Sequence, residues 1–408
     1  LALTNTLFGV LVKVYLSLSY SRLHLPKIFK QIMNEQLNTN QNIQLTVLSP
    51  LHIGAGTEKR IVYGIDYFYD TNKKRVYIIA PDKLFGALRN KGANLNTYSS
   101  MIADNKKREL EKWLFDTLKI SLADISAYNY SLNAPPDNEI NTFIRSGLNT
   151  PYIPGSSLKG AIRTAIFHYL YQKHEKDNNG NLITKAPFPI YKDQAEQYLI
   201  GNFDNSIMRH IKIGDAVCIK QQLALSFVGL FNLYPNNNST TTDWASDWKN
   251  GFSITSETLE PTSTAEFRLS IGQPFIDILS TKFNAKLPQF IHQVIPQKNP
   301  LKHLFNIINS YTQTHLEREI AFFKTYDHAE DSDLIIGQLE SFLQEIVSNS
   351  NKNMCILRMA WGSGFHAISG DWQYIDHTDT GFQKNGKKKY KSRRIAYDKC
   401  MGFVKLNF

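Results

Sequence analysis

The sequence predicts an α+β fold in which strand–helix–strand units are repeated. Short segments of alternating apolar residues are bounded by turn signals, and amphipathic helical stretches follow them. The pattern Leu-x-Gly-Ala-(Leu/Ile)-Arg also occurs twice, at residues 84–89 and 158–163, each time after a strand and a Pro-containing turn. The pattern is short, so a chance similarity between two amphipathic helices stays open as the alternative.

The first half of the chain predicts a strand, a hairpin and helices in that order. Ile43, Leu45 and Val47 alternate in the first strand, which ends at a Ser-Pro step and leads into the loop LHIGAGTEKR. Residues 61–70 and 75–80 predict a hairpin around the turn TNKK. Pro81 and Asp82 mark the first turn of a helix, and residues 91–140 are expected to be mostly helical up to the turn NAPPDN.

The segment PYIPGSSLKGAIRTAIFHYLYQK is the most informative in the chain. A short strand meets a Pro-Gly turn, after which Ser156 or Ser157 is expected to cap a helix. Lys159 and Arg163 lie four residues apart and share one helical face. Another face is apolar and is expected to pack inward; it comprises Leu158, Ile162, Ala165, Ile166, Tyr169 and Leu170.

The second half predicts further strands around a helical region. Residues 211–219 and 223–234 are expected to be strands, and residues 252–271 a hairpin that turns at PTST. Residues 297–350 are expected to be mainly helical, and GFVKLNF to form a final strand.

Composition favours an anionic partner, which is a nucleic acid, a membrane surface or an acidic protein. The 408 residues carry a formal net charge of +10 and 12% aromatic residues, a combination suited to single-stranded RNA, whose bases stack on rings. Three scattered cysteines without a CxxC pair argue against a disulfide framework and a cysteine zinc site.

The apolar stretch 7–20 is short and contains Lys13, so neither a signal peptide nor a membrane span is expected, and Met33 is the expected natural start. A true N-terminal strand is the alternative.

The start of the predicted helix at PGSSLKGAIR is a candidate phosphate site. Unpaired amides and partial positive charge at a helix N-terminus attract anions, and two cations lie nearby. The segment does not satisfy the Walker A pattern, so nucleotide hydrolysis is not implied. The alternative is a capped helix with solvated cations. The candidate residues are Gly155, Ser156, Ser157, Lys159, Gly160 and Arg163.

Two glycine-bearing loops are further candidates. In LHIGAG, Gly54 and Gly56 permit close approach of a ligand beside His52, for which a structural role is the alternative. In RMAWGSGF, a ring on a flexible loop is suited to stacking on a base or anchoring a partner, with a buried Trp as the alternative. The candidates in this second loop are Arg358, Trp361, Gly362, Gly364 and Phe365.

Basic residues outside these loops are expected to add electrostatic affinity for phosphates. They are Arg209 and Lys212 in MRHIKIGDA and Lys387, Lys388, Lys389, Arg393 and Arg394 in the densest basic run. A metal site is not expected, because Asp204 and Asp215 have no evident partner in sequence. No cofactor is expected.

PYIPGSSLKGAIRTA resembles the hallmark segment of the RAMP superfamily of CRISPR-associated proteins, and LTVLSPLHIGAGTE resembles its opening strand and loop. MRHIKIGDA, SETLEPTSTAEFRLSI and SRRIAYDKCMGFVKL are similar to further segments of these subunits. ILRMAWGSGF and the overall length resemble one branch, the fifth subunit of the type III-A (Csm) effector complex. The resemblance runs from about residue 43 to the end.

The resemblance implies tandem ferredoxin-like (RRM-like) RAMP domains with helical insertions, at residues 34–205 and 206–408, after an extension at 1–33. It also implies a non-catalytic, cytoplasmic subunit that caps the 3′ end of the crRNA and assists its maturation in antiviral defence. The implied partners are the crRNA, a neighbouring backbone RAMP subunit, the small subunit and host nucleases, with no membrane.

Three other functions stay open. A RAMP endoribonuclease would use His52 or His210, a backbone subunit would repeat along the guide, and a scaffold would keep the fold without touching RNA. RAMP processing enzymes use a His, and backbone subunits use a loop Asp. No residue here is matched to either, which favours binding without chemistry.

Overall fold

The computed structural model describes residues 39–56, 59–174, 206–232, 251–272, 300–324, 329–349, 353–370 and 392–408, with shorter pieces at 196–197, 199–202, 204, 234–235, 244–245, 383–384 and 387–388. The predicted extension at 1–33 and Lys389 lie outside these residues. Across this part of the chain, no helix has both the length and the apolar character needed to cross a membrane.

A seven-stranded sheet forms the centre of the molecule, in the order β15-β20-β1-β14-β9-β7 with β8 also paired to β14. Its strands are β1 (Thr39–Val47), β7 (Tyr152–Ile153), β8 (Ile211–Ile213), β9 (Ala216–Lys220), β14 (Thr264–Ile271), β15 (Met354–Arg358) and β20 (Phe403–Asn407). Helix α7 (Gly155–His174) lies between β1 and β9 in the chain, and α10 (Pro300–Lys324) between β14 and β20.

Strands β20, β1, β14 and β9 are neighbours and all pair antiparallel. With α7 and α10 they form the β-α-β-β-α-β arrangement of a ferredoxin-like unit. The predicted α+β class is confirmed. Because β1 pairs with β14 and β20, strand pairing crosses the expected boundary between residues 205 and 206, so this boundary does not separate two sheets.

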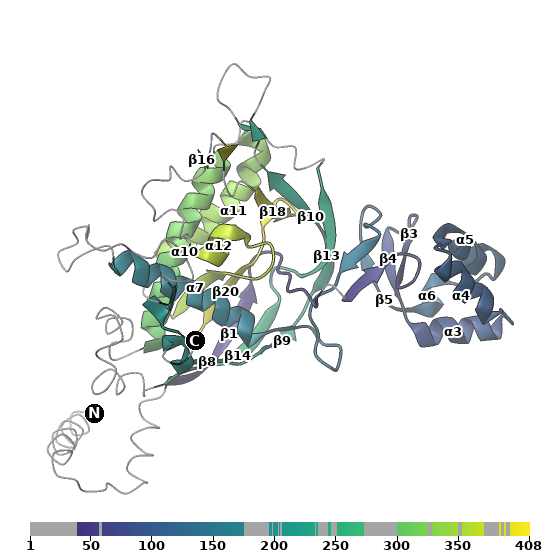
Figure 1. Ribbon diagram of the computed structural model, residues 1–408, viewed down its shortest axis with the longest axis horizontal. Coiled ribbons are helices and arrows are strands. Elements are labelled where there is room, and N and C mark those ends of the chain that lie inside the picture. Colours follow the sequence, from purple (N-terminus) through teal and green to yellow (C-terminus); the bar gives the residue numbers. More distant parts are fainter. Residues whose placement is uncertain are drawn as a thin grey trace, which may run out of the picture.

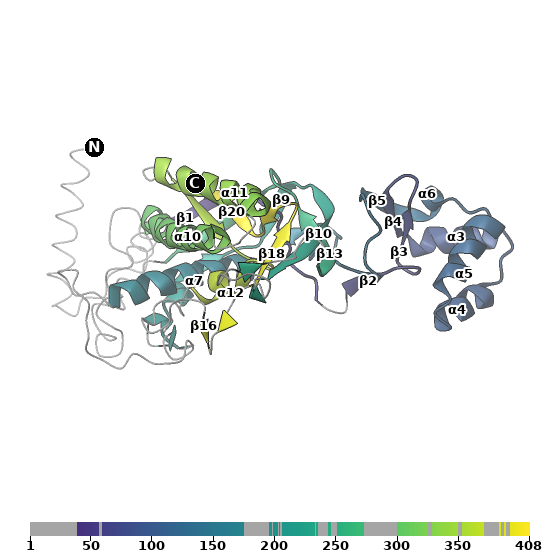
Figure 2. The ribbon, with the colours of Figure 1, turned by 90° about the horizontal axis from the view of Figure 1, so that it is seen from above.

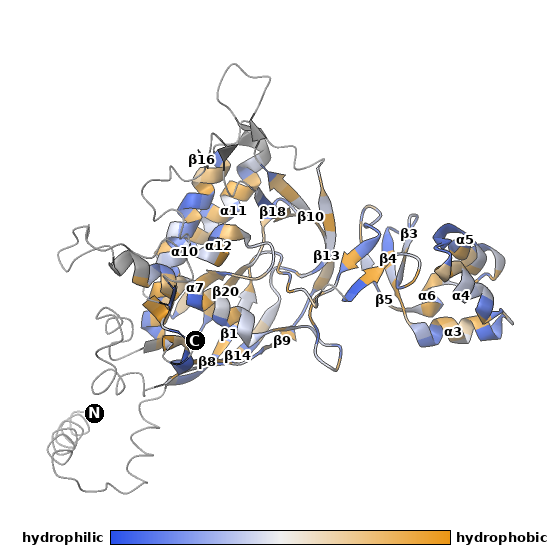
Figure 3. Cartoon of the chain, in the orientation of Figure 1, coloured by the Kyte–Doolittle hydropathy of each residue, from blue (hydrophilic) through white to orange (hydrophobic). Residues whose placement is uncertain are grey.

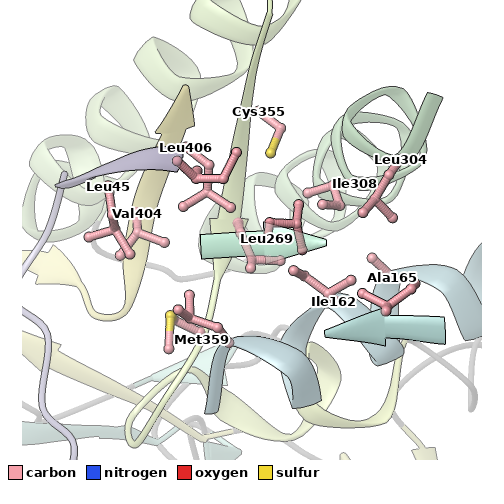
Figure 4. Close-up of a cluster of buried hydrophobic side chains, with 14 of the residues drawn as sticks. Leu45, Ile162, Ala165, Leu269, Leu304, Ile308, Cys355, Met359, Val404 and Leu406 are labelled. Atoms are coloured by element: carbon pink, nitrogen blue, oxygen red, sulfur yellow. The ribbon is translucent and has the colours of Figure 1, made fainter. Parts of the chain in front are cut away.

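The main hydrophobic core lies between this sheet and helices α7 and α10 (Figure 4). Alternation places Ile43, Leu45 and Val47 of β1 on the inner face, as predicted, and all three are buried. Leu158 and Ile162 of α7 are fully buried against them, which confirms the predicted apolar stripe.

A second sheet has the order β19-β18-β10-β13-β6-β2. Its strands are β2 (Arg60–Val62), β6 (Glu139–Asn141), β10 (Leu223–Asn232), β13 (Ser253–Leu259), β18 (Ser392–Ala396) and β19 (Lys399–Cys400). Helix α11 (Ala329–Ser348) and the second half of α10 pack on it through an aromatic cluster that includes Phe231, Phe322 and Phe323. Figure 3 shows apolar and polar residues alternating along both helices.

The hairpin predicted for residues 252–271 is wrong. Strand β13 pairs with β10 in the second sheet, whereas β14 pairs with β1 in the first. The chain changes sheets at Pro261–Ser263, where Thr262 has a φ of 75°. Since β13 is buried on both faces and β14 alternates, the two strands suit different sheets.

Residues 63–132 form a lobe that extends away from both sheets (Figures 1 and 2). It contains β3 (Tyr67–Asp70), β4 (Arg75–Ile79), β5 (Ser126–Ser131), α3 (Pro81–Asn90), α4 (Leu95–Ala103), α5 (Lys107–Lys112), a π-helical turn (Trp113–Thr117) and α6 (Leu122–Ile125). The predicted hairpin and the helix beginning at Pro81 are confirmed. Residues 91–140 are only partly helical, because β5 and β6 fall in this range.

Candidate nucleic-acid interface

The start of α7 packs against residues 211–215, which follow the η3 turn (Ile207–His210). A Cβ atom on Gly155 would lie 2.5 Å from the carbonyl oxygen of Ile213 and 2.7 Å from that of Gly214, so only glycine fits there. The amide of Gly155 donates a hydrogen bond of 2.7 Å to the Asp215 carboxylate. The structure therefore joins PGSSLKGAIR to MRHIKIGDA, two segments that are separate in sequence.

This contact corrects one part of the predicted phosphate site. Asp215 takes the first amide and places a negative charge at the positive end of the helix. The amides of Ser157 and Leu158 donate to the Pro154 carbonyl oxygen at 3.0 and 3.2 Å. The amides of Gly155 and Ser157 are therefore satisfied inside the protein, contrary to the prediction that they bind phosphate.

The side chains that follow leave a polar face open to solvent. Ser156 and Gly160 are exposed, and Lys159 is half-buried. No hydrogen bond or ion pair engages the Lys159 amine among the described residues, and burial lowers the pKa of this amine. Arg163 has 45% of its side chain exposed but pairs with Glu196 at 2.8 Å. Lys159 is thus the more available cation of the two.

The two glycine-bearing loops meet each other. His52 and Trp361 form an antiparallel bridge, in which the Trp361 amide donates to the His52 carbonyl oxygen at 3.2 Å. Their rings contact edge to face at a centroid distance of 5.3 Å. Gly54 bridges to Phe143 on the other side. Three loop glycines adopt positive φ values that other residues rarely adopt: Gly56, Gly362 and Gly364.

Helix α12 (Gly364–Ser369) joins the second loop to α7, and the two helices lie side by side in Figures 1 and 2. Thr164 of α7 donates to the Ile368 carbonyl oxygen at 3.4 Å, and His168 Nδ1 lies 2.8 Å from the Gly370 carbonyl oxygen. We call the exposed parts of Ser156, Lys159 and Gly160, together with loops 52–56 and 361–365, the α7–loop surface.

The buried carboxylate of Glu257, which was not predicted from the sequence, holds residues next to this surface in place. Glu257 is fully buried in β13, and its carboxylate accepts hydrogen bonds from the Tyr130 hydroxyl at 2.7 Å and the Phe143 amide at 2.8 Å. Arg145 donates to both carboxylate oxygens at 2.8 and 2.9 Å. The Glu257 carbonyl oxygen lies 2.7 Å from His52 Nδ1.

The side chain of His52 is only 3% exposed and lies between the rings of Phe143 and Trp361. Burial lowers the pKa of His52, and the contact with Glu257 offsets part of this effect, so the neutral form is favoured at pH 7. The prediction that the His52 side chain contacts RNA is therefore contradicted, and its role here is to join the two loops.

Two predicted RNA contacts are buried ion pairs instead. Arg358 and Arg393 are each 2% exposed. Arg358 donates to the Glu319 carboxylate of α10 at 2.8 Å, and Arg393 binds both of its oxygens at 2.6–2.9 Å. Arg393 also lies over the Phe322 ring at 3.9 Å. An unpaired buried charge would be unfavourable, so each arginine needs the Glu319 carboxylate beside it. Their ion pairs therefore join α10 to the sheets.

The remaining basic candidates lie on other parts of the chain. Arg209 is exposed and donates to the Asp204 carbonyl oxygen, and Lys212 is exposed on β8. Lys387 and Lys388 form β17, which pairs with β16 (Gln383–Lys384). Across the described residues, no cluster of three or more His, Cys, Asp or Glu side chains is suited to hold a metal.

Comparisons with known proteins agree with this architecture. The sequence model of the RAMP superfamily matches residues 44–373. A Streptococcus thermophilus protein named "CRISPR system Cms protein Csm5" is 32% identical over 136 residues, 31% of this chain and 37% of that protein. A protein of the same name from Enterococcus italicus is 28% identical over 149 residues, 30% and 42% of the two chains. The chain therefore matches less than half the length of either relative.

Two solved structures share the fold. A chain in the cryo-EM structure of a type III-A Csm–crRNA–target RNA ternary complex superposes with a TM-score of 0.64 at 18% identity, covering 90% of this chain and 100% of that one. The crystal structure of T. onnurineus Csm5 gives a TM-score of 0.58 at 18% identity, covering 88% and 99%. Since the superfamily match also spans most of the sequence, the chain belongs to the RAMP superfamily.

Proposed function

We propose that the chain is a non-catalytic, RNA-binding subunit of a type III-A CRISPR effector complex. It caps the 3′ end of the crRNA beside a backbone RAMP subunit and the small subunit, in the cytoplasm, and assists maturation of that end, which host nucleases cut. Similarity to two proteins named Csm5, and to a chain in a crRNA-containing Csm complex, supports this assignment.

The observation that carries the proposal is the α7–loop surface. Lys159 has no carboxylate partner among the described residues, and the exposed Ser156 and Gly160 leave room beside it for a sugar–phosphate backbone. Two glycine loops, joined at His52 and Trp361, adjoin this helix through α12. A cation on a helix that contacts one of these loops through α12 suits RNA binding with little dependence on base sequence.

The test is reconstitution of the effector complex with Lys159→Ala and, as a matched control, Lys220→Ala. Lys220 is exposed at the end of β9, away from α7. Lys159→Ala is expected to weaken crRNA binding, to lower the log–log salt slope by about 0.7 for each phosphate that the variant no longer neutralises, and to shift the mapped crRNA 3′ terminus. Equal affinity and the same 3′ terminus for both variants would refute the assignment of this surface.

The cap and the enzyme make different predictions for purified protein. Repeat RNA incubated with the chain, with and without EDTA, is expected to stay intact, since His52 is buried and engaged with Glu257. Cleavage that disappears in His52→Ala or His210→Ala would favour an endoribonuclease. One copy of the chain per complex agrees with a cap, whereas several copies would indicate a backbone subunit.

A further inference from the structure

The loop at residues 146–150 presents one apolar side chain to solvent from a rigid support. Leu148 is 91% exposed, more than any other large apolar side chain among the described residues. Backbone hydrogen bonds of 2.9 Å close the loop on itself. At its base, Arg145 bridges to Pro151 and pairs with the buried Glu257 carboxylate. The loop is therefore held in shape without burying Leu148.

Two more apolar side chains are exposed on β9, beside this loop. Strand β7 follows the loop and pairs with β9, so that Tyr152 lies opposite Val217. Val217 and Ile219 are 62% and 65% exposed, and the half-buried Tyr152 shares a face with its partner Val217. We call the side chains of Leu148, Tyr152, Val217 and Ile219 the β7–β9 surface.

The charges around the β7–β9 surface are mostly positive. Lys212 of β8, Lys220 of β9 and Arg268 of β14 are exposed, and none of them pairs with a carboxylate among the described residues. The register of β14 with β8 and β9 puts Lys212 and Arg268 on the same face as Val217. Glu266, which is half-buried opposite Val217, is the only acidic residue of β7, β8, β9 and β14.

These features favour a protein contact. Exposed apolar side chains that lie together mark interaction sites, because water is expelled from them when a partner binds. Leu148 stands on a loop that is already ordered, so binding costs little further backbone entropy. Aliphatic side chains offer no ring for stacking on a base, and the surrounding cations complement carboxylates.

We propose that the β7–β9 surface docks on another protein subunit of the effector complex, at an apolar hollow bordered by carboxylates. This inference rests on the proposed function, because it takes that complex as the source of the partner. No residue of the α7–loop surface belongs to the β7–β9 surface. Nor does Arg394, whose guanidinium lies 5.5 Å from the centroid of the Trp361 ring. Docking and RNA binding can therefore be lost separately.

The test is competition for a place in the complex. Equal amounts of the wild type and a variant, each full-length, are mixed with limiting amounts of the other subunits and the crRNA, and mass spectrometry gives their ratio in the purified complex. Leu148→Ser combined with Ile219→Ser is expected to be incorporated about 10- to 100-fold less than the wild type. The matched control is Leu334→Ser, which removes a side chain 68% exposed on α11 and is expected to compete equally.

Single charges at the edge of the β7–β9 surface give a second comparison. Arg268→Glu is expected to be incorporated less than the wild type, because it sets a like charge against the carboxylates of the partner. Lys220→Ala is expected to compete nearly equally, since one exposed cation contributes little. Incorporation of Arg268→Glu above that of the wild type would contradict an acidic partner and overturn the inference.

RNA affinity and stability complete the test. The double variant alone is expected to bind single-stranded RNA and to melt like the wild type, since the replaced side chains are exposed. Equal incorporation of the double variant and the wild type would overturn this inference and leave the proposed function intact. Weakened RNA binding would assign the surface to RNA instead, and a lower melting temperature for Leu148→Ser alone would show that this side chain packs in the free chain; either result would overturn the inference. Absence of the wild-type chain from the complex would overturn the proposed function as well.

Discussion

Two helices share the Leu-x-Gly-Ala pattern, and their glycines offer a matched experiment. Gly160 of α7 and Gly86 of α3 are both exposed in a helix interior, and an added Cβ would meet nothing within 4 Å at either position. Alanine is favoured over glycine there, because it loses less backbone entropy on folding. Gly160→Ala and Gly86→Ala are each expected to raise the free energy of unfolding by about 0.5–1 kcal/mol.

At Gly155, the first residue of α7, an alanine is expected to have the opposite effect on stability. The added Cβ would lie 2.5 Å from a backbone oxygen of Ile213 and 2.7 Å from one of Gly214. Neither atom belongs to a flexible side chain, so the helix must move away from β8 and strain the bond between Gly155 and Asp215. By analogy with overpacked cores, Gly155→Ala is expected to lower the free energy of unfolding by about 1–3 kcal/mol.

The same variants separate stability from RNA binding. The methyl group of Gly160→Ala stands on the α7–loop surface, so this more stable variant is expected to bind RNA more weakly, whereas Gly86→Ala binds as the wild type does. Urea denaturation followed by circular dichroism gives the free energies, and filter binding gives the affinities. A neutral Gly155→Ala, or a Gly160→Ala that is less stable than Gly86→Ala by more than about 1 kcal/mol, would refute this reading of α7.

Three further outcomes follow from buried groups. Glu257→Ala leaves the partly buried Arg145 guanidinium without its carboxylate and is expected to cost about 3–5 kcal/mol of unfolding free energy, while the pair Glu257→Leu with Arg145→Met costs much less; additive losses in the double-mutant cycle would contradict this. Burial would raise the pKa of Glu319, but Arg393 and Arg358 outweigh it and hold this pKa well below 4.5. As the pH falls, the unfolded state, in which Glu319 has an ordinary pKa of about 4.3, takes up the proton first. The stability that ionised Glu319 contributes is therefore fully present above this pH and is lost as the pH falls through the folded-state pKa. Acid titration of stability should be steeper for the wild type than for Glu319→Gln, and parallel curves would count against this. Burial raises the pKa of Cys218 to about 11, so iodoacetamide at pH 8 should label this thiol slowly in the native protein and faster in urea; equal rates would be contrary evidence.

The sequence predicted those elements whose buried face is determined by the residue pattern within a single segment. The alternation of Ile43, Leu45 and Val47 placed β1 correctly, and the apolar stripe of α7 has the predicted burial. In each instance a periodicity of one segment specifies which face packs inward. The choice of partner strand is not local, which is why residues 252–271 looked like a hairpin although β13 and β14 lie in different sheets.

The candidate site was predictable in its loops and not in its charges. Glycines marked both loops, and the structure brings the loops together at His52 and Trp361. Arg358 and Arg393 have the same appearance in a sequence whether they meet solvent or a carboxylate. Their partner Glu319 lies 39 and 74 residues away, so only the tertiary structure identifies them as buried ion pairs.

The most direct measurement places a photoreactive 4-thiouridine at the 3′ end of the crRNA in the assembled complex and maps the crosslinked peptides by mass spectrometry. Crosslinks to peptides that contain residues 52–56, 155–163 or 361–365 are predicted. Crosslinks confined to the lobe at residues 63–132, or found only on other subunits, would contradict RNA binding by the α7–loop surface.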